Sequence, residues 1–182
     1  MKQLLLITTF LLTCLAGSGQ EIYSCKGPKI SFFSSAPMED ISAVSDRGVS
    51  AINIKTKAIY FKVHMNSFQF KKALMQEHFN ENYVESEKFP FAEYKGKYAE
   101  DVDFSKNGTY PVNVEGTLNL HGVERSYKGK GTITVRDGKF NVNSKFNVTV
   151  ADHKIKIPTL VVKNIAEVVE VTVNADYQPV TK

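Results

Sequence analysis

The sequence contains no tryptophan, only two cysteines and only four histidines among its 182 residues. Two cysteines are too few for a disulfide scaffold or a four-cysteine zinc site. The sequence also lacks G-x-S-x-G, H-E-x-x-H, phosphate-loop and C-x-x-C motifs, and its histidines form no spaced pair. We therefore expect a protein that is not an enzyme and that has no metal site and no cofactor of its own.

A strong excess of charge of one sign is also absent, with 23 basic and 19 acidic residues and a net charge of +4. No block is dense in lysine and arginine, so nucleic acid is not an expected partner. No apolar run reaches the ~20 residues that a membrane-spanning helix needs. The composition, with 42% hydrophobic and 11% aromatic residues, is that of a globular chain.

The first 19 residues have the pattern of a secretory signal peptide. A positive start at Lys2 precedes an apolar stretch of about 13 residues and then small residues ending at Gly19. We predict removal of residues 1–19, which lowers the net charge to +3 and leaves Cys25 without a disulfide partner. Cys25 is expected to be a half-buried small residue near the start of the first strand, and a reactive thiol is the alternative. The alternatives are an uncleaved membrane anchor and a lipoprotein attached through Cys14.

Residues 20–182 show one dominant pattern, an alternation of apolar and polar side chains. This period of two is typical of antiparallel strands with one buried and one wet face. Strands are predicted at residues 29–35, 41–45, 49–54, 58–65, 91–99, 109–120, 125–136, 139–150 and 167–177. No linker divides the chain, so we expect a single domain.

Turn residues separate several of these strands. Asp137-Gly138 and Asn107-Gly108 are both typical of two-residue hairpins, because each position tolerates a positive φ. His121-Gly122 marks a third reversal. Residues 71–83 break the alternation, since Met75, Phe79 and Tyr83 are spaced by four and predict one short helix. A further loop or short helix is expected at 152–163.

The apolar face of such a sheet must be buried. A sandwich buries it against a second sheet, whereas a barrel closes on itself and removes the exposed edges. An eight-stranded barrel is either filled by side chains or wide enough for one small ligand. Alternation shows which face is inside and does not distinguish a cavity from a solid core.

Two stretches resemble the YceI-like family of exported bacterial proteins. The first comprises Met75-Gln76-Glu77-His78-Phe79, the segment 85–90 with its Lys-Phe-Pro ending, and the aromatic strand 91–96. The second, residues 114–123, is similar to the family's G-x-L-x-x-H-G-V signature. The resemblance covers residues 29–177.

This resemblance implies an all-β fold, an extended lipocalin-like antiparallel barrel of about eight strands with one short helix. It also implies a hydrophobic small molecule as partner, a polyisoprenoid-type lipid or isoprenoid quinone, which the protein binds without changing it chemically. The expected apolar lining is Phe61, Val63, Met75, Phe79, Phe89, Phe91, Leu118, Leu120, Val135, Phe140, Phe146 and Val171. Such a binding protein predicts a continuous apolar tunnel.

Two histidines, His78 and His121, could have either a structural role or a role in binding a metal or a lipid headgroup. We expect His78 to fix the helix to the barrel and His121 to bond the backbone of its turn, rather than to bind a metal or a headgroup. The expected function is lipid sequestration in the periplasm, with extracellular release or attachment to the envelope as alternatives. The competing function is a packed-core envelope stress or interaction protein that acts through its surface.

Overall fold

The computed structural model describes residues 21–35, 40–156 and 167–180. The predicted signal peptide and part of the predicted loop at 152–163 lie outside these residues. The elements are β1 (Ile22–Lys26), β2 (Lys29–Ser34), β3 (Ile41–Ser45), β4 (Gly48–Asn53), β5 (Ala58–His64), η1 (Met65–Ser67), β6 (Gln69–Phe70), α1 (Ala73–His78), η2 (Phe79–Tyr83), β7 (Phe91–Tyr98), β8 (Gly108–Leu120), β9 (Val123–Arg136), β10 (Lys139–Thr149), η3 (Val150–His153) and β11 (Val168–Pro179).

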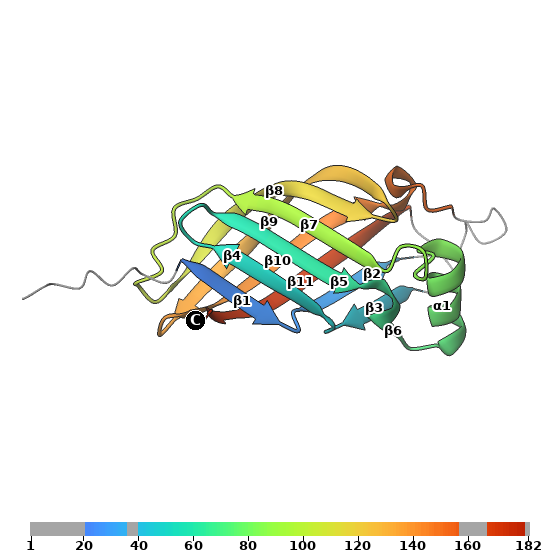
Figure 1. Cartoon of the computed structure of the whole chain (residues 1–182), viewed down its shortest axis with the longest axis horizontal. Helices are drawn as coiled ribbons and strands as arrows, with labels where there is room; N and C mark the ends of the chain where they lie inside the picture. The colour runs from blue at the N-terminus through green and yellow to red at the C-terminus, as the bar shows by residue number, and fades with distance from the viewer. Residues whose placement is uncertain (1–20, 36–39, 157–166, 181–182) are drawn as a thin grey trace, which may run out of the picture.

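The strands form an antiparallel barrel, as predicted. In the described residues, the order β1-β4-β5-β7-β8-β9-β10-β11 is closed by pairing of β1 with β11, where Tyr23 faces Pro179. Figure 1 shows these long strands crossing the molecule obliquely, with α1 at one end and the end of β11 at the other. The β1–β11 pairing closes eight strands into a barrel, and β2, β3 and β6 extend the sheet beyond this closure, with β6 last in the strand order.

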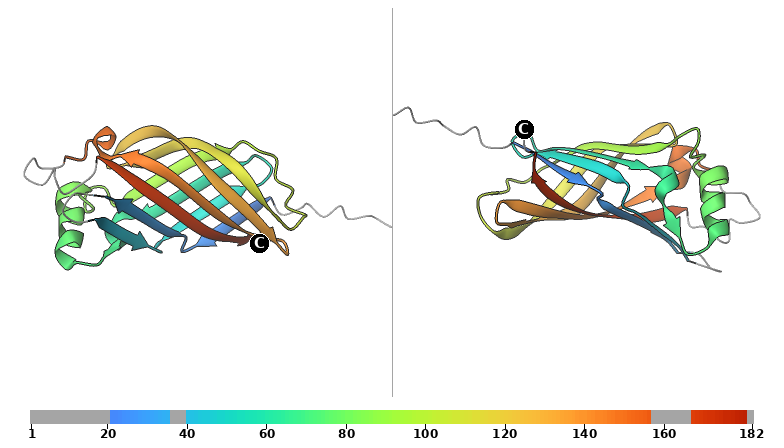
Figure 2. Two further views of the ribbon diagram at one scale, coloured as in Figure 1. Left: turned by 180° about the vertical axis from the view of Figure 1, so that it is seen from behind. Right: turned by 60° about the horizontal axis from the view of Figure 1, so that its bottom comes forward.

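Two of the barrel's strands are interrupted. β1 and β2 both pair with β11 and are separated by Gly27-Pro28. On their other side, β4 pairs with β1 and β3 pairs with β2. Gly27 has a φ of 73° and Pro28 has no N–H to offer the ladder, so the strand bends there. Beyond the bend, β3 pairs with the short β6 instead of β5. Figure 2 shows α1 standing across this end of the barrel.

The barrel interior has two different halves. Away from α1, a buried group of side chains that we call the packed cluster fills the interior. Its members are Cys25, Ile52, Ile59, Tyr98, Val112, Ile133, Val135, Phe140, Val142, Ala175 and Tyr177. Aromatic rings dominate it, with the Phe140 ring 5.0 Å from that of Tyr177 and 4.9 Å from that of Phe104. Cys25 lies in this group as a free thiol and is buried, where a half-buried position was predicted.

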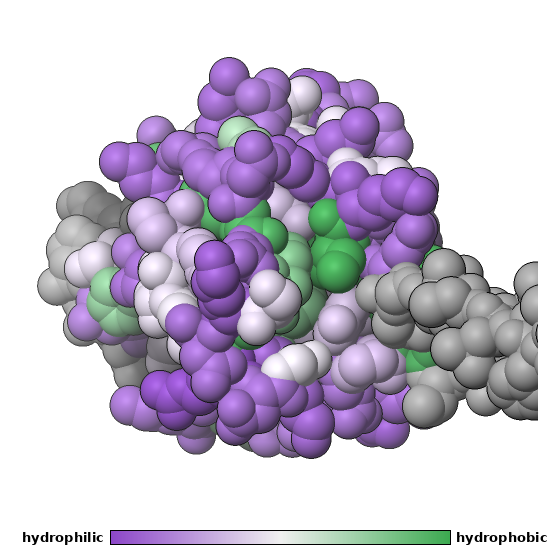
Figure 3. Space-filling model, turned by 90° about the vertical axis from the view of Figure 1, so that its left-hand side faces the viewer, coloured by the Kyte–Doolittle hydropathy of each residue, from purple (hydrophilic) through white to green (hydrophobic). Residues whose placement is uncertain are grey.

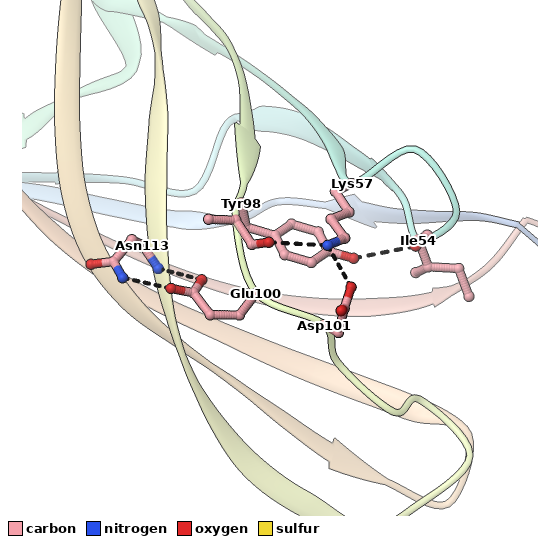
Figure 4. Close-up of polar contacts among 7 residues, drawn as sticks. Ile54, Lys57, Tyr98, Glu100, Asp101 and Asn113 are labelled. Atoms are coloured by element: carbon pink, nitrogen blue, oxygen red, sulfur yellow. Dashed lines mark hydrogen bonds and ion pairs between the residues drawn. The ribbon is translucent and has the colours of Figure 1, made fainter.

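Residues 99–107 close the barrel end beyond the packed cluster. Lys57 Nζ donates to the carbonyl of Ala99 at 3.0 Å and pairs with Asp101 at 2.6 Å, while Glu100 accepts the backbone N–H of Asn113 at 2.7 Å (Figure 4). The loop places Phe104 against the packed cluster. Figure 3 views this end and shows hydrophobic side chains at the centre of a hydrophilic rim.

The predicted helix at 71–83 is present in two pieces, α1 and the π-helical turn η2. Among the described residues, no helix is both long and apolar enough to cross a bilayer. The strands β1 and β6 were not predicted, and the two residues of β6 are too few for alternation to stand out.

Two of the three predicted tight turns are correct. His121 and Gly122 have φ values of 53° and 70°, and Asp137 and Gly138 have values of 51° and 74°. The Asn107-Gly108 hairpin is wrong, because β8 begins at Gly108 after a long loop. Asn107 instead accepts the backbone N–H of Asp137 at 2.9 Å and so supports the neighbouring turn.

Candidate ligand-binding cavity

The half of the barrel nearer α1 contains a cavity of about 490 Å³. This volume lies within the range of small-molecule sites in proteins. Apolar side chains from nearly every barrel strand line it, and Met75, His78 and Phe79 contribute from α1 and η2. Ile52, Ile59 and Val142 belong both to the lining and to the packed cluster, so they form the inner limit of the cavity.

Most of the predicted lining residues meet at this cavity. Eight of them line it: Phe61, Val63, Met75, Phe79, Leu118, Leu120, Phe146 and Val171. They come from β5, α1, η2, β8, β10 and β11, so the alternation on separate strands converges on one space. The alternation therefore identified the inward faces correctly for these strands.

The other four predicted residues lie elsewhere. Val135 and Phe140 point inward but belong to the packed cluster, where neighbouring rings fill the space. Phe91 lies on the outer face of β7, with Lys62 Nζ 3.9 Å from its ring centroid and the His64 ring at 4.6 Å. Phe89 packs outside the cavity against His121, at 4.4 Å between ring centroids.

An aromatic group near α1 was missed by the sequence analysis. The rings of Phe32, Phe68 and Phe70 surround Phe79, with centroid distances of 5.5, 5.8 and 5.0 Å. All four line the cavity. Phe32 could have been found because it shares the inward parity of Ile30 and Ser34 on β2. Phe68 and Phe70 lie at the junction of η1 and β6, a segment too short to show an alternation of apolar and polar residues.

Tyr94 was also missed, although it shares the inward parity of Ala92 on β7. Its ring lies across two glycines that pair with each other, Gly96 of β7 and Gly116 of β8. A Cβ at Gly116 would lie 2.7 Å from Tyr94 Cζ and would also meet the carbonyl oxygen of Lys95. The absence of a side chain at Gly116 therefore makes room for the tyrosine ring.

Alanine at Gly116 should destabilise the barrel by about 2 kcal/mol, because backbone and ring must both move. Gly108→Ala in the same strand is the control, since its Cβ would meet only the outer part of the Tyr110 ring at 3.3 Å. Urea unfolding of both variants measures the difference. Equal unfolding midpoints would contradict this account of Gly116.

His153 is the most deeply buried polar side chain of the cavity's surroundings, with an exposed fraction of 0%. Its Nδ1 lies 3.2 Å from the carbonyl oxygen of Leu120 and 3.0 Å from that of Val123, so Nδ1 carries the proton. Nε2 then accepts the hydroxyl proton of Tyr127 at 2.9 Å. Burial lowers the pKa of His153 and favours this neutral form.

His121 joins three segments near the cavity's α1 end. Its Nε2 lies 2.7 Å from Glu85 Oε2, and its Nδ1 lies 3.1 Å from the carbonyl oxygen of His153. Both partners are oxygen acceptors, so each contact is made by an N–H of the ring. The hydrogen bond from His121 lowers the pKa of Glu85. The structural role predicted for His121 has other partners than expected, because these two contacts of the ring are to η3 and to the segment before β7 and not to the backbone of its own turn.

The described residues contain no group of three or more His, Cys, Asp or Glu side chains that could hold a metal ion. His78 lines the cavity from α1 and is exposed. The cavity thus offers apolar contact over most of its surface and a few hydroxyl groups, an arrangement suited to binding a hydrophobic molecule.

Comparison with known proteins gives one family and several similar structures. The family described as YceI-like domain matches residues 31–177. No curated protein sequence matches the chain.

Among solved structures, a polyisoprenoid binding domain from Saccharophagus degradans, implicated in plant cell wall breakdown, is 17% identical, with a TM-score of 0.72 over 86% of this chain and 98% of that one. BcnA of Burkholderia cenocepacia is 11% identical, with a TM-score of 0.71 over 82% and 95% of the two chains. A Campylobacter jejuni YCEI protein is 15% identical, with a TM-score of 0.57 over 82% and 85%. At these identities the likeness concerns the fold.

Proposed function

Because this chain belongs to the family of YceI-like domains, we propose that it binds a polyisoprenoid, an isoprenoid quinone or a similar lipid in its cavity, without catalysis. The observation that carries this proposal is the apolar cavity of about 490 Å³ inside the barrel. A packed-core protein acting through its surface would have no use for this space, since a filled core is the more stable arrangement.

The energetic basis of binding is the removal of apolar surface from water. Each square ångström contributes ~25 cal/mol, so a long hydrocarbon chain gains affinity without a strong polar contact. The polyisoprenoid binding domain from Saccharophagus degradans has a similar fold, which supports an isoprenoid ligand for this chain.

The ligand's route follows from the two ends of the barrel. The packed cluster and residues 99–107 occupy the end far from α1. The lining reaches the exposed side chain of His78 on α1 at the other end. In our proposal the lipid therefore enters and leaves beside α1. Export to the periplasm is part of the same proposal and rests on the sequence of residues 1–19.

Solvent extraction of the purified protein followed by mass spectrometry is the first test, and a stoichiometric isoprenoid lipid is the expected result. The second is thermal unfolding with an added isoprenoid quinone. A ligand at one hundred times its Kd should stabilise the fold by about 2.7 kcal/mol. For a chain of this size that raises Tm by roughly 5–10 °C. An empty extract together with an unchanged Tm would contradict the proposal.

A further inference from the structure

The hydroxyl group of Tyr94 has no hydrogen-bond partner among the described residues, although the side chain lines an apolar cavity. Tyr83, which lines the cavity from η2, also has no hydrogen bond among the described residues, whereas three other tyrosines of the interior have partners. The Tyr98 hydroxyl donates to the carbonyl of Ile54 at 3.4 Å, that of Tyr127 donates to His153, and that of Tyr177 bonds to Ser50. Among the described residues, Asn80 Oδ1 is the only buried side-chain N or O atom without a partner, so the Tyr94 hydroxyl is open to the cavity that its side chain lines.

The glycine contacts show where this hydroxyl lies. A Cβ at Gly96 would be 2.9 Å from the Tyr94 hydroxyl oxygen, so the phenol extends along β7 toward the packed cluster. Gly96 pairs with Ile59, which belongs to both the cavity lining and the packed cluster. The free hydroxyl therefore lies near the inner limit of the cavity, on the side away from α1.

The surroundings favour an uncharged partner for this hydroxyl. Lys128 contributes to the lining, but its ammonium group pairs with Glu115 at 3.1 Å and its side chain is largely exposed. His78 lies on α1 at the other end of the cavity. A phosphate near Tyr94 would therefore be desolvated without a counter-charge, at a high cost.

The hydroxyl is also a stable donor. Burial, with a smaller contribution from the charge of Glu115, raises the pKa of Tyr94 to about 12. The phenol therefore keeps its proton at neutral pH. A phenylalanine would fill the same place over the glycines, so what distinguishes tyrosine here is a donor that a molecule bound in the cavity can use.

We propose that Tyr94 is the polar anchor of the cavity and donates a hydrogen bond to an uncharged oxygen of the ligand. This inference rests on the proposed function and narrows it to neutral isoprenoid alcohols or quinones over diphosphates. The oxygen-bearing end lies at the inner limit of the cavity, and the hydrocarbon chain extends from there toward α1.

The test compares two probes of similar length, the C20 alcohol geranylgeraniol and the C20 hydrocarbon phytane. Their affinities are measured by displacement of the fluorescent dye N-phenyl-1-naphthylamine from the wild type and from Tyr94→Phe. We expect Tyr94→Phe to weaken geranylgeraniol binding roughly 3–10-fold, the value of one hydrogen bond. Phytane binding should change less than about twofold, since it makes no hydrogen bond.

Tyr110→Phe is the matched control, because its hydroxyl donates outside the cavity to the carbonyls of Asp103 and Lys106, both at 3.2 Å. It should leave both affinities unchanged. Equal effects of Tyr94→Phe on alcohol and hydrocarbon, or no effect on either, would overturn the anchor while leaving lipid binding intact. Failure of both probes to bind the wild type would overturn the proposed function and the anchor together.

Discussion

An aspartate in place of Phe146 should abolish lipid retention while the barrel still folds. Phe146 lies in the cavity wall, 6.2 Å from the Tyr94 ring and 6.1 Å from the Tyr127 ring between centroids. In the unoccupied cavity a carboxylate there can stay hydrated, because Phe146 is only half buried. A bound hydrocarbon chain would remove that water, at a cost of several kcal/mol, which weakens binding at least ~100-fold.

Two further variants separate this effect from a general loss of structure. Asn143→Asp adds the same charge to the same strand but on its outer face, where Asn143 pairs with Asn174 and Thr132. Phe146→Leu keeps the wall apolar. Both should retain bound lipid, measured by extraction and mass spectrometry. A folded Phe146→Asp protein that retains wild-type amounts of lipid would remove Phe146 from the binding site.

The contrast between Phe146 and Phe140 shows what alternation can and cannot predict. Both lie on β10 with the same parity, and both point inward. Phe146 meets open space, whereas Phe140 meets Tyr23, Phe104 and Tyr177. Parity follows from the strand itself, but whether the interior is filled depends on side chains brought from distant strands. The sequence pattern therefore predicted the barrel and its inner faces, and could not locate the cavity along its length.

The surroundings of individual residues explain why the sequence analysis placed some of them wrongly and missed others. Phe91 is strongly apolar, so composition favoured it over Ala92, yet Ala92 has the inward parity and lines the cavity. The role of Tyr94 depends on Gly116, a residue of another strand, and no spacing in the sequence connects the two. Asn107 and Gly108 have the composition of a hairpin, but Asn107 bonds to the turn at Asp137 instead.

Replacing His153 with alanine should cost about 3–4 kcal/mol of unfolding free energy. The change leaves a cavity and removes the partner of three groups, the carbonyls of Leu120 and Val123 and the hydroxyl of Tyr127. His78→Ala is the control, since His78 is exposed and should change stability by less than about 0.5 kcal/mol. Chemical denaturation at pH 7.5 measures both, and similar values would refute the structural role of His153.

The pH dependence of stability gives an independent test of the same histidine. Burial holds the pKa of His153 in the folded state below its ordinary value of 6.5, against smaller opposing effects of the two carbonyls. As pH falls through 6.5, the unfolded chain gains a proton that the folded chain does not, so the folded state loses stability. Arg125 opposes protonation and Asp152 favours it, and neither reverses the direction of the shift. The wild type should therefore lose more stability between pH 7.5 and 5.5 than His153→Ala, and equal losses would show that His153 titrates alike in both states.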